Sequence, residues 1–372
     1  MRRIFDRGSL RALPLAERRN KLDIARDRVD LATYEAALAP EAAEDAARAA
    51  AEARAARARG APVILAFGAH AIKNGLGPAL ARLLVEGRVT HLATNGAGVI
   101  HDWEFAYQGR TGEDVRRYVA EGQFGLWDET GTYLSLALAV GARRGLGYGE
   151  SVGAMVAEGG LAIPGDAELA AEIAAGAAAG AGRETMGKAA AAADLRALLA
   201  GSGFGPGFLR LDHPFKSDCV SASAWSAGRP FTCHPMFGHD IIYTHPMSRG
   251  APIGRTAELD FLSFADSVSA LEGGVYLSVG SAVMSPMIFE KALSMSRNAA
   301  RREGRAIEDF SIHVVDLARS SWDWTRDGEP PQDDPAYYLR YCKTFSRMGG
   351  RMSYASADNR AWLAAFARGL LD

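Results

Sequence analysis

The sequence predicts an α/β protein built on a mostly parallel, Rossmann-like sheet with helices on both faces. Short apolar runs rich in β-branched residues recur along the chain, and a glycine-containing turn follows several of them. Apolar residues at helical spacing come next, and strands that alternate with helices in this way form parallel sheets with both faces covered. The length of 372 residues allows one large core or about two domains.

The first elements lie in the N-terminal third of the chain. Residues 35–60 are rich in Ala, Glu and Arg, which predicts a helix that Gly60 ends, and its weakly apolar faces indicate a surface helix. PVILAF at 62–67 predicts a buried strand. Leu76, Leu80, Leu83 and Leu84 share one face of the helix that follows it, and Gly87 ends that helix. VTHLAT at 89–94 predicts the next strand.

The same order returns in the C-terminal half. Strands are expected at 230–235, 274–279 and 310–315, with a helix before the second of them and another from Ser285, where Pro286 suits the first turn. A Gly/Ala-rich tract at about 160–215 predicts a helical insertion. We therefore expect an N-terminal arm and helix at 1–60, and a single nucleotide-binding α/β domain at 61–372 that carries this insertion.

Composition excludes several functional classes. The net charge of −2 provides no basic surface for nucleic acid. Three cysteines without CxxC spacing, namely Cys219, Cys233 and Cys342, argue against a disulfide framework and a zinc knuckle. The charged first residues lack the apolar core of a signal peptide, and no segment is apolar enough to span a membrane, so we expect a cytoplasmic protein without a membrane partner.

Ligands of parallel α/β sheets bind at the carboxyl ends of the strands, which directs attention to the loops there. The first loop carries Gly68, His70 and Lys73, and the second is TNGAGVIHDWE. Glycines let the backbone approach a phosphate or ribose, although neither loop has the spaced glycine triplet of a dinucleotide fingerprint. The alternative is that the glycines form tight turns and that His101, Asp102 and Glu104 form a structural hydrogen-bond cluster.

A third loop, CHPMFGHDIIYTHPM, holds His234, His239, Asp240 and His245. No two of these histidines have the spacing by which one helix offers two ligands to zinc. Ligands from separate strand ends could still form a catalytic metal site, and the candidates for this alternative are His70, His101, Asp102, His239 and Asp240. None of these strand-end loops contains a GxSxG motif, so a serine-hydrolase elbow has little support there.

Four segments in this order resemble deoxyhypusine synthase, a NAD-dependent family. They are AFGAHAIKNGLGPALARLLVEG, THLATNGAGVIHDWE, PFTCHPMFGHDIIYTH and GGVYLSVGSAVMSPMIFEKAL. The TNGAGVIHD segment also resembles the NAD-binding C-terminal region of ornithine cyclodeaminase-like proteins once called the lysine-ketoglutarate reductase and saccharopine dehydrogenase region.

The resemblance implies that NAD lies across the strand-end loops. The cofactor-binding residues that it implies are Gly68, His70, Lys73, Thr94, Asn95, Gly96, Gly98, Asp102, Gly238, Gly280 and Ser281. The family passes a carbon fragment through an imine on an active-site lysine, and Lys343, eight residues after Pro335, is the candidate for it. The other candidate catalytic residues are His239, His101 and Asp240.

The chain also departs from the family pattern. Met284, Ser285 and Pro286 stand where the family has paired histidines, and the serine-rich run before the family's lysine is absent. We therefore expect an enzyme of altered catalytic residues, a transferase or oxidoreductase that acts on a small amine or related metabolite. The resemblance also implies a homo-oligomer, either a dimer or a tetramer. The alternatives are a metal-dependent hydrolase and a non-catalytic module that binds a nucleotide or sugar.

Overall fold

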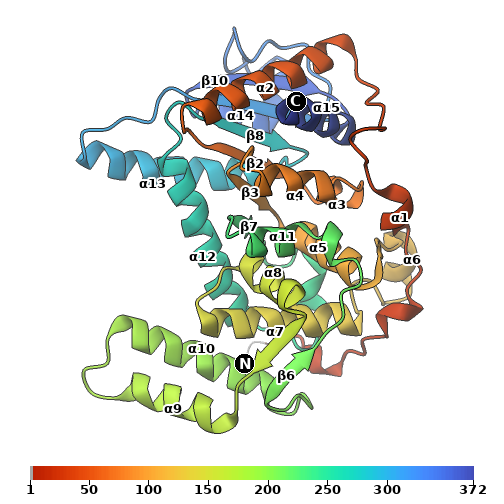
Figure 1. Ribbon diagram of the computed structural model, residues 1–372, viewed down its shortest axis with the longest axis vertical. Helices are drawn as coiled ribbons and strands as arrows, with labels where there is room; N and C mark the ends of the chain where they lie inside the picture. The colour runs from red at the N-terminus through yellow and green to blue at the C-terminus, as the bar shows by residue number, and fades with distance from the viewer. Residues whose placement is uncertain (1–2) are drawn as a thin grey trace.

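The computed structural model, which describes residues 3–372, is built around a six-stranded parallel sheet (Figure 1). In spatial order its strands are β10 (Arg351–Ser356), β9 (Ser311–Asp316), β8 (Val275–Val279), β2 (Val63–Phe67), β3 (His91–Thr94) and β7 (Phe231–Cys233). The strand order reverses between β8 and β2, as it does in doubly wound dinucleotide-binding folds. The predicted α/β class with a mostly parallel sheet is confirmed.

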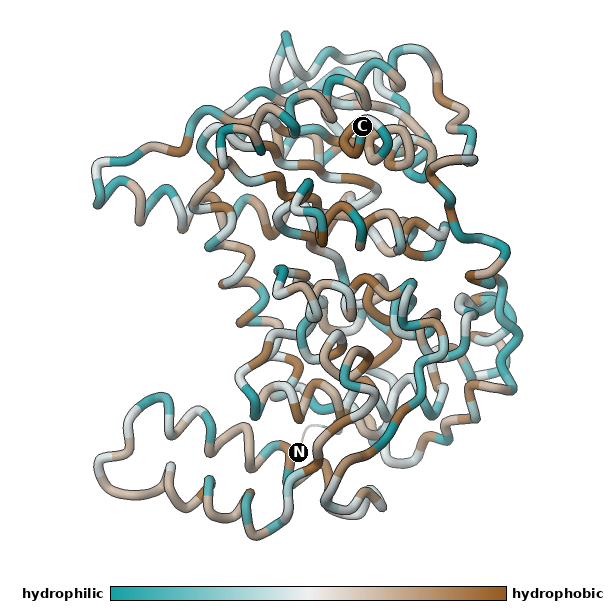
Figure 2. Tube along the Cα trace, in the orientation of Figure 1, coloured by the Kyte–Doolittle hydropathy of each residue, from teal (hydrophilic) through white to brown (hydrophobic). Residues whose placement is uncertain are grey.

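Alternate side chains of each strand point to opposite faces of the sheet. On β2, Leu65 and Phe67 pack in one core, whereas Ile64 and Ala66 pack in the other. The first face is covered by α2 (Pro40–Ala58), α4 (Gly77–Val85), α5 (Gly96–Gln108), α11 (Val220–Ser226) and α15 (Asn359–Leu371). The second is covered by α12 (Gly250–Ser269), α13 (Met284–Arg302) and α14 (Arg340–Ser346). Hydrophobic segments follow the strands between these layers (Figure 2).

A long insertion separates α5 from β7 and forms the lower part of the molecule in Figure 1. Its elements are β4 (Arg110–Thr111), α6 (Val115–Ala120), α7 (Asp128–Arg144), α8 (Tyr148–Glu158), β5 (Gly160–Ile163), α9 (Asp166–Ala177), α10 (Arg183–Leu199), β6 (Gly207–Arg210) and η3 (Lys216–Asp218). The Gly/Ala-rich tract forms the hairpin of α9 and α10, which β5 and β6 join at its base as an antiparallel pair. The insertion thus begins well before residue 160, because α7 and α8 also belong to it.

The N-terminal arm crosses the insertion before it reaches the sheet. It holds η1 (Arg7–Ser9), η2 (Leu15–Glu17), β1 (Leu22–Asp23) and α1 (Ile24–Asp27). β1 pairs antiparallel with β4, and Arg7 donates to the carbonyl oxygens of Tyr243 (3.0 Å) and Ser248 (2.9 Å). The arm therefore holds the segment that follows β7. No helix within residues 3–372 is long and apolar enough to cross a bilayer.

Helix α2 is not a surface helix, contrary to the sequence-based expectation. Its alanines, among them Ala46, Ala50 and Ala53, are buried, and the helix packs against α15. Alanine faces have a low hydrophobicity, so their pattern is weak, but their small size permits close packing between helices. The same helix supplies two carboxylates, Asp45 and Glu52, to the imidazole of His313 on β9.

This buried His313 network predicts a pH-dependent stability. A hydrogen bond from His313 lowers the pKa of Glu52 to about 2, and the two carboxylates raise the pKa of His313 although burial opposes this. The Glu52 carboxylate therefore stabilises the folded state above its ordinary pKa of about 4.5, and this stabilisation is lost as pH falls through about 2. The His313 imidazolium stabilises the folded state below the ordinary histidine pKa of about 6.5, and this stabilisation is lost as pH rises through the raised pKa of His313.

The stabilisation should therefore be largest between about pH 4.5 and 6.5. We expect His313→Gln to lower the free energy of unfolding by about 1–3 kcal/mol in that window. Urea denaturation of both proteins across pH 3–9 measures the difference. A difference that does not vary with pH would show that the network carries no charge.

Candidate functional site

The strand-end edge of the sheet brings together most of the predicted cofactor residues. The crevice of a doubly wound sheet lies where the strand order reverses, which here is between β2 and β8. The residues that reach this edge are Gly68 after β2, Thr94, Asn95, Gly96 and Gly98 after β3, Gly238 after β7, and Gly280 and Ser281 after β8.

The two loops at the reversal point are packed backbone to backbone. The Gly68 amide donates to the carbonyl oxygen of Val279 at 3.0 Å, and the Gly280 amide donates to that of Val315 at 2.9 Å. A Cβ atom on Gly68 would overlap the carbonyl oxygen of Gly280. Gly280 also has a φ of +60°, which favours glycine. These glycines are required by the packing of the two loops.

The end of β3 begins α5 through small and polar residues. Thr94 Oγ1 donates to the carbonyl oxygen of Phe67 at 3.0 Å, and a Cβ atom on Gly98 would overlap this threonine. Asn95 caps α5 by accepting a hydrogen bond from the Gly98 amide at 2.9 Å. The Asn95 side-chain oxygen is thus already used by the helix.

After β8, Ser285 does not cap the next helix, because the N-cap position of α13 is Val283, which makes no side-chain capping bond. Ser281 Oγ accepts a hydrogen bond from the Ser285 amide at 3.1 Å, whereas the Ser285 hydroxyl lies 2.8 Å from Tyr276 Oη within the core. Pro286 does lie in the first turn of α13, as predicted.

His101 belongs to a polar cluster on α5. Its Nδ1 lies 2.7 Å from Thr111 Oγ1, and Thr111 in turn donates to Glu104, which forms a bidentate ion pair with Arg18. Burial lowers the pKa of His101 to about 4, so that the ring is neutral at pH 7. His101 and Glu104 thus take part in a structural hydrogen-bond cluster, as the alternative interpretation expected, whereas Asp102, which it also included, does not join them.

His70 and Lys73 lie on α3 (His70–Lys73), a single turn that packs against α5. His70 is exposed, and Lys73 is half-buried. Burial lowers the pKa of both, and the Lys73 cation lowers that of His70 further. The pKa of His101 on α5 is lowered mainly by burial. The nearby charges of Lys73 and His70 lower it further.

Two predicted residues have other roles in this structure. The Asp102 carboxylate accepts from the amides of Val220 (2.8 Å) and Ser221 (2.9 Å), so it is used to cap the start of α11. Lys343 lies on α14 beside β10, at the opposite edge of the sheet from β7, with Nζ 3.6 Å from the centre of the Tyr337 ring. Neither joins the residues gathered at the reversal point.

The alternative metal site does not form. Within residues 3–372 no group of three or more His, Cys, Asp and Glu side chains is arranged to hold a metal ion. Among its five candidates, His101 is bonded to Thr111, Asp102 to α11, and His239 is exposed in the loop after β7. These positions separate the side chains that a shared ligand sphere would need.

Among the candidate acid–base residues, Asp240 is the one whose carboxylate is buried against a strand-end loop. It precedes η4 (Ile241–Thr244), is 8% exposed, and its carboxylate lies against Gly96, where a Cβ atom would overlap it. Burial raises the pKa of Asp240 to about 6, while the backbone amides of Ala97 and Met236 act in the opposite direction. A carboxyl group with such a pKa can exchange a proton near neutral pH.

Three further titratable residues, on or beside elements that pack against β7, were absent from the sequence-based site. Tyr148 begins α8, Tyr243 lies in η4, and Asp260 on α12 accepts from the amides of Cys233 (2.6 Å) and Gly149 (2.9 Å). Burial raises the pKa of Asp260 to about 8. Tyr243 lies within the histidine-rich loop that the sequence singles out, so that loop was its one signal. Tyr148 had none, because the insertion brings it there.

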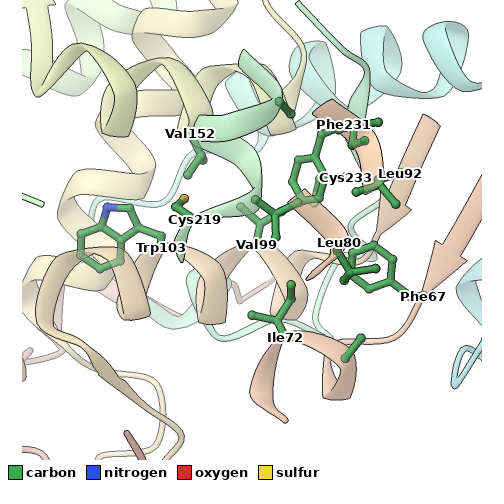
Figure 3. Close-up of a cluster of buried hydrophobic side chains, with 14 of the residues drawn as sticks. Phe67, Ile72, Leu80, Leu92, Val99, Trp103, Val152, Cys219, Phe231 and Cys233 are labelled. Atoms are coloured by element: carbon green, nitrogen blue, oxygen red, sulfur yellow. The ribbon is translucent and has the colours of Figure 1, made fainter. Parts of the chain in front are cut away.

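Buried hydrophobic side chains of β7, β3, α5 and α8 pack together near this edge of the sheet. Phe231 and Cys233 of β7 pack with Leu92 of β3 and Val99 of α5, and Val152 of α8 joins them (Figure 3). Cys233 is buried, and burial raises the pKa of its thiol, so it is a core residue and not a thiolate. The site therefore lies on a rigid packed layer.

One surface cleft lies away from this edge. It has a volume of about 630 Å³ between α7, α10 and α12. Its basic residues are paired, since Arg143 binds Glu172 at 2.7 Å and Arg255 binds Asp194 at 3.0 Å. This pairing within the described part of the chain makes the cleft a poor site for an anionic ligand.

The fold and its reversal point define a doubly wound α/β protein of the dinucleotide-binding architecture. No family model matches the chain, and no curated protein matches it. Among solved structures, unliganded AgrE aligns with 91% of this chain and 34% of its own, at 15% identity and a TM-score of 0.43. AgrE in a ternary complex with ornithine and NAD⁺ aligns over the same shares, at 12% identity and a TM-score of 0.42.

A LOR/SDH protein from Methanococcus maripaludis aligns with 91% of this chain and 69% of its own, at 11% identity and a TM-score of 0.42. The chain thus spans about a third of the length of AgrE. At these identities and TM-scores the likeness supports no argument about function, which must come from the site itself.

Proposed function

We propose that this chain binds a nicotinamide dinucleotide at the reversal point between β2 and β8 and acts with it as an oxidoreductase or transferase on a small amine. The observation that carries the proposal is the reversal of the strand order, because ligands of doubly wound sheets bind outside the strand ends at such a reversal, and Gly68 and Gly280 meet there. Several residues that follow the strands here are small, including Ala69, Ala97 and Ala282, and short side chains let a ligand approach the backbone closely.

A bound nicotinamide would supply the acceptor or donor of a hydride. The chain's own residues would supply the proton chemistry, for which Asp240 has a suitable pKa of about 6. Its carboxylate is ionised at pH 7 and could accept a proton from an amine. The Asp240 carboxylate is fixed against Gly96, so its position does not depend on the exposed part of the loop.

Deoxyhypusine synthase activity in particular would need a lysine near the nicotinamide. The family lysine candidate, Lys343, lies at the far edge of the sheet, so Lys73 on α3 is the better-placed amine in this structure. The homo-oligomer implied by the resemblance stays a prediction, which light scattering of the purified chain would test.

Titration with NAD⁺ tests the proposal directly. We expect saturable binding by calorimetry at micromolar to millimolar NAD⁺, and weaker binding of ADP-ribose, which lacks the nicotinamide ring. Absence of heat and of any thermal shift at millimolar NAD⁺ would refute the dinucleotide site. Equal affinity for ADP-ribose would instead indicate a nucleotide-binding module without recognition of nicotinamide.

A further inference from the structure

Two cavities share the C-terminal part of α13 as a wall (Figure 1). They have volumes of about 360 and 490 Å³, and Arg297 and Arg301, one turn apart on the helix, line both of them. We call the smaller one the arginine cavity. Its other lining residues lead into β9 and β10 and are Arg305, Ala306, Ile307, Glu308, Gly349 and Gly350. The arginine cavity thus lies at the amino ends of these parallel strands, on the opposite edge of the sheet from the proposed dinucleotide site.

The Arg297 guanidinium is held in position at the wall of the arginine cavity. Its Nε donates to the carbonyl oxygen of Ile307 at 3.0 Å, and its central carbon lies 5.9 Å from the centre of the Phe310 ring. A Cβ atom on Gly349 would lie 3.2 Å from Arg297 Nη2, so the guanidinium also reaches the backbone before β10. Only Nε forms a hydrogen bond among the described residues, which leaves the N–H donors of both terminal nitrogens available.

Positive charge exceeds negative charge among the residues that line the arginine cavity. Three of them carry a guanidinium group, and one, Glu308, carries a carboxylate. Arg305 is paired with Glu303 at 2.6 Å. Within the described part of the chain, neither Arg297 nor Arg301 forms an ion pair within 4.0 Å. These two cations are therefore available to a bound anion.

The carboxylates of neighbouring residues have partners of their own. They are Glu272, which accepts from the amides of Glu308 and Asp309, Asp309, which pairs with Arg351, and Glu290, which pairs with Lys291. None of these contacts involves the two free arginines.

Two glycines form the side of the arginine cavity next to β10. Gly349 and Gly350 have φ values of +77° and +76°, which favour glycine, and a Cβ atom on Gly350 would overlap Phe310. Among the described residues neither glycine amide donates a hydrogen bond, whereas the next amide, that of Arg351, donates to the carbonyl oxygen of Phe310. Backbone amides without an internal partner are common ligands of anions.

We propose that the arginine cavity binds a phosphate group that carries two negative charges, as in a small phosphomonoester. Terminal phosphate oxygens accept several hydrogen bonds at once, and the planar fork of arginine matches their geometry. A volume of about 360 Å³ suits a small ligand and not a polymer. This site goes beyond the proposed function, because it involves neither the strand-end loops nor the dinucleotide.

The helix dipole alone does not account for this arrangement. Arg301 and Arg302 lie in the last turn of α13, where cations interact favourably with the helix end. Arg297 lies before that turn, and only Arg301 of the two last-turn arginines lines the cavities. The dipole acts on Arg301 and Arg302 alike, so these two residues provide a matched pair for an experiment.

Calorimetric titration of the full chain with methyl phosphate tests the proposal. The titration is done at pH 8, where a phosphomonoester carries about two negative charges, and at constant ionic strength, because salt screens exposed charges. We expect saturable binding, and binding at least about tenfold weaker for dimethyl phosphate, which carries one charge and two terminal oxygens. Inorganic phosphate is titrated in parallel, and the tighter of the two dianions identifies whether the ligand is an ester or free phosphate.

The variants separate a specific contact from a general attraction of anions. Arg301→Gln should weaken methyl phosphate binding by about tenfold, and Arg297→Gln should weaken it at least as much. Arg302→Gln removes the same charge from the same helix turn and should leave the affinity unchanged. Arg301 is exposed and unpaired among the described residues, so Arg301→Gln should not change the Tm of the free chain. This variant therefore tests the site even if Arg297→Gln fails to fold.

Three outcomes would overturn the phosphate site. They are absence of heat with both dianions at about 10 mM, unchanged affinity in Arg301→Gln, and an equal loss of affinity in Arg301→Gln and Arg302→Gln. The last outcome would show that only the overall charge of the helix end attracts the anion. None of these outcomes depends on NAD⁺ binding, since the arginine cavity and the reversal point share no residue.

Discussion

Replacing Arg18 with methionine should lower the free energy of unfolding by about 3–5 kcal/mol at pH 7. The Arg18 and Glu104 side chains are each 1% exposed, and their two hydrogen bonds measure 2.8 and 2.6 Å. Methionine would leave the Glu104 carboxylate buried with only hydroxyl donors from Thr111 and Thr130. A buried charge without its counterion is strongly unfavourable.

Urea denaturation measures this loss, and Arg117→Met is the control. Arg117 pairs with Glu121 one turn along an exposed helix face, so its removal should cost less than about 0.5 kcal/mol. The Arg18→Met loss should also shrink at pH 5, because Glu104 can then take up a proton. A loss below about 1 kcal/mol at pH 7 would contradict the importance of this pair.

The Arg18 pair illustrates what the sequence could and could not predict about the site. The run from Thr94 to Glu104 indicated polar groups that need partners at a strand end. It did not indicate that the partner of Glu104 would come from the N-terminal arm, because nothing in the local pattern of residues 1–33 points to a buried arginine. Long-range pairing of this kind is set by the tertiary fold.

The sheet itself was largely predictable, and its exceptions have physical causes. Buried parallel strands are apolar over their whole length, as β2 and β8 are, and such runs are visible in a sequence. β10 was missed because this edge strand, RMSYAS, is half polar and lacks a continuous apolar run. The strand order was not predictable, since periodicity does not indicate which strands are neighbours.

Some residues of the candidate site were predictable from the sequence, and others were not. Glycines and short polar residues at strand ends were found because their position follows from the class of sheet. Tyr148 was missed because only the fold of the insertion brings α8 against β7, and Asp102 was misplaced because helical spacing alone does not show which face of α5 meets α11. The site thus requires both the local signal and the packing of distant elements.

The second large expected effect concerns the meeting point of the two loops. Gly68→Ala should lower the free energy of unfolding by about 1–3 kcal/mol, because the new methyl group would overlap the Gly280 carbonyl oxygen. Backbone cannot move aside as a flexible side chain can, so the loops after β2 and β8 must separate. If the dinucleotide binds at this point, its affinity should fall by more than about tenfold.

The matched control is Gly254→Ala, on the exposed side of α12. A Cβ atom there would have no neighbour within 4 Å, and alanine should stabilise the helix by about 0.5–1 kcal/mol. Calorimetry measures the NAD⁺ affinity of both variants. Because each variant replaces one glycine with alanine, a loss of affinity in Gly68→Ala alone would be due to the position of that glycine. Unchanged NAD⁺ affinity in a folded Gly68→Ala protein would place the ligand elsewhere, since a dinucleotide at the β2–β8 reversal point has to contact the backbone that this methyl group displaces.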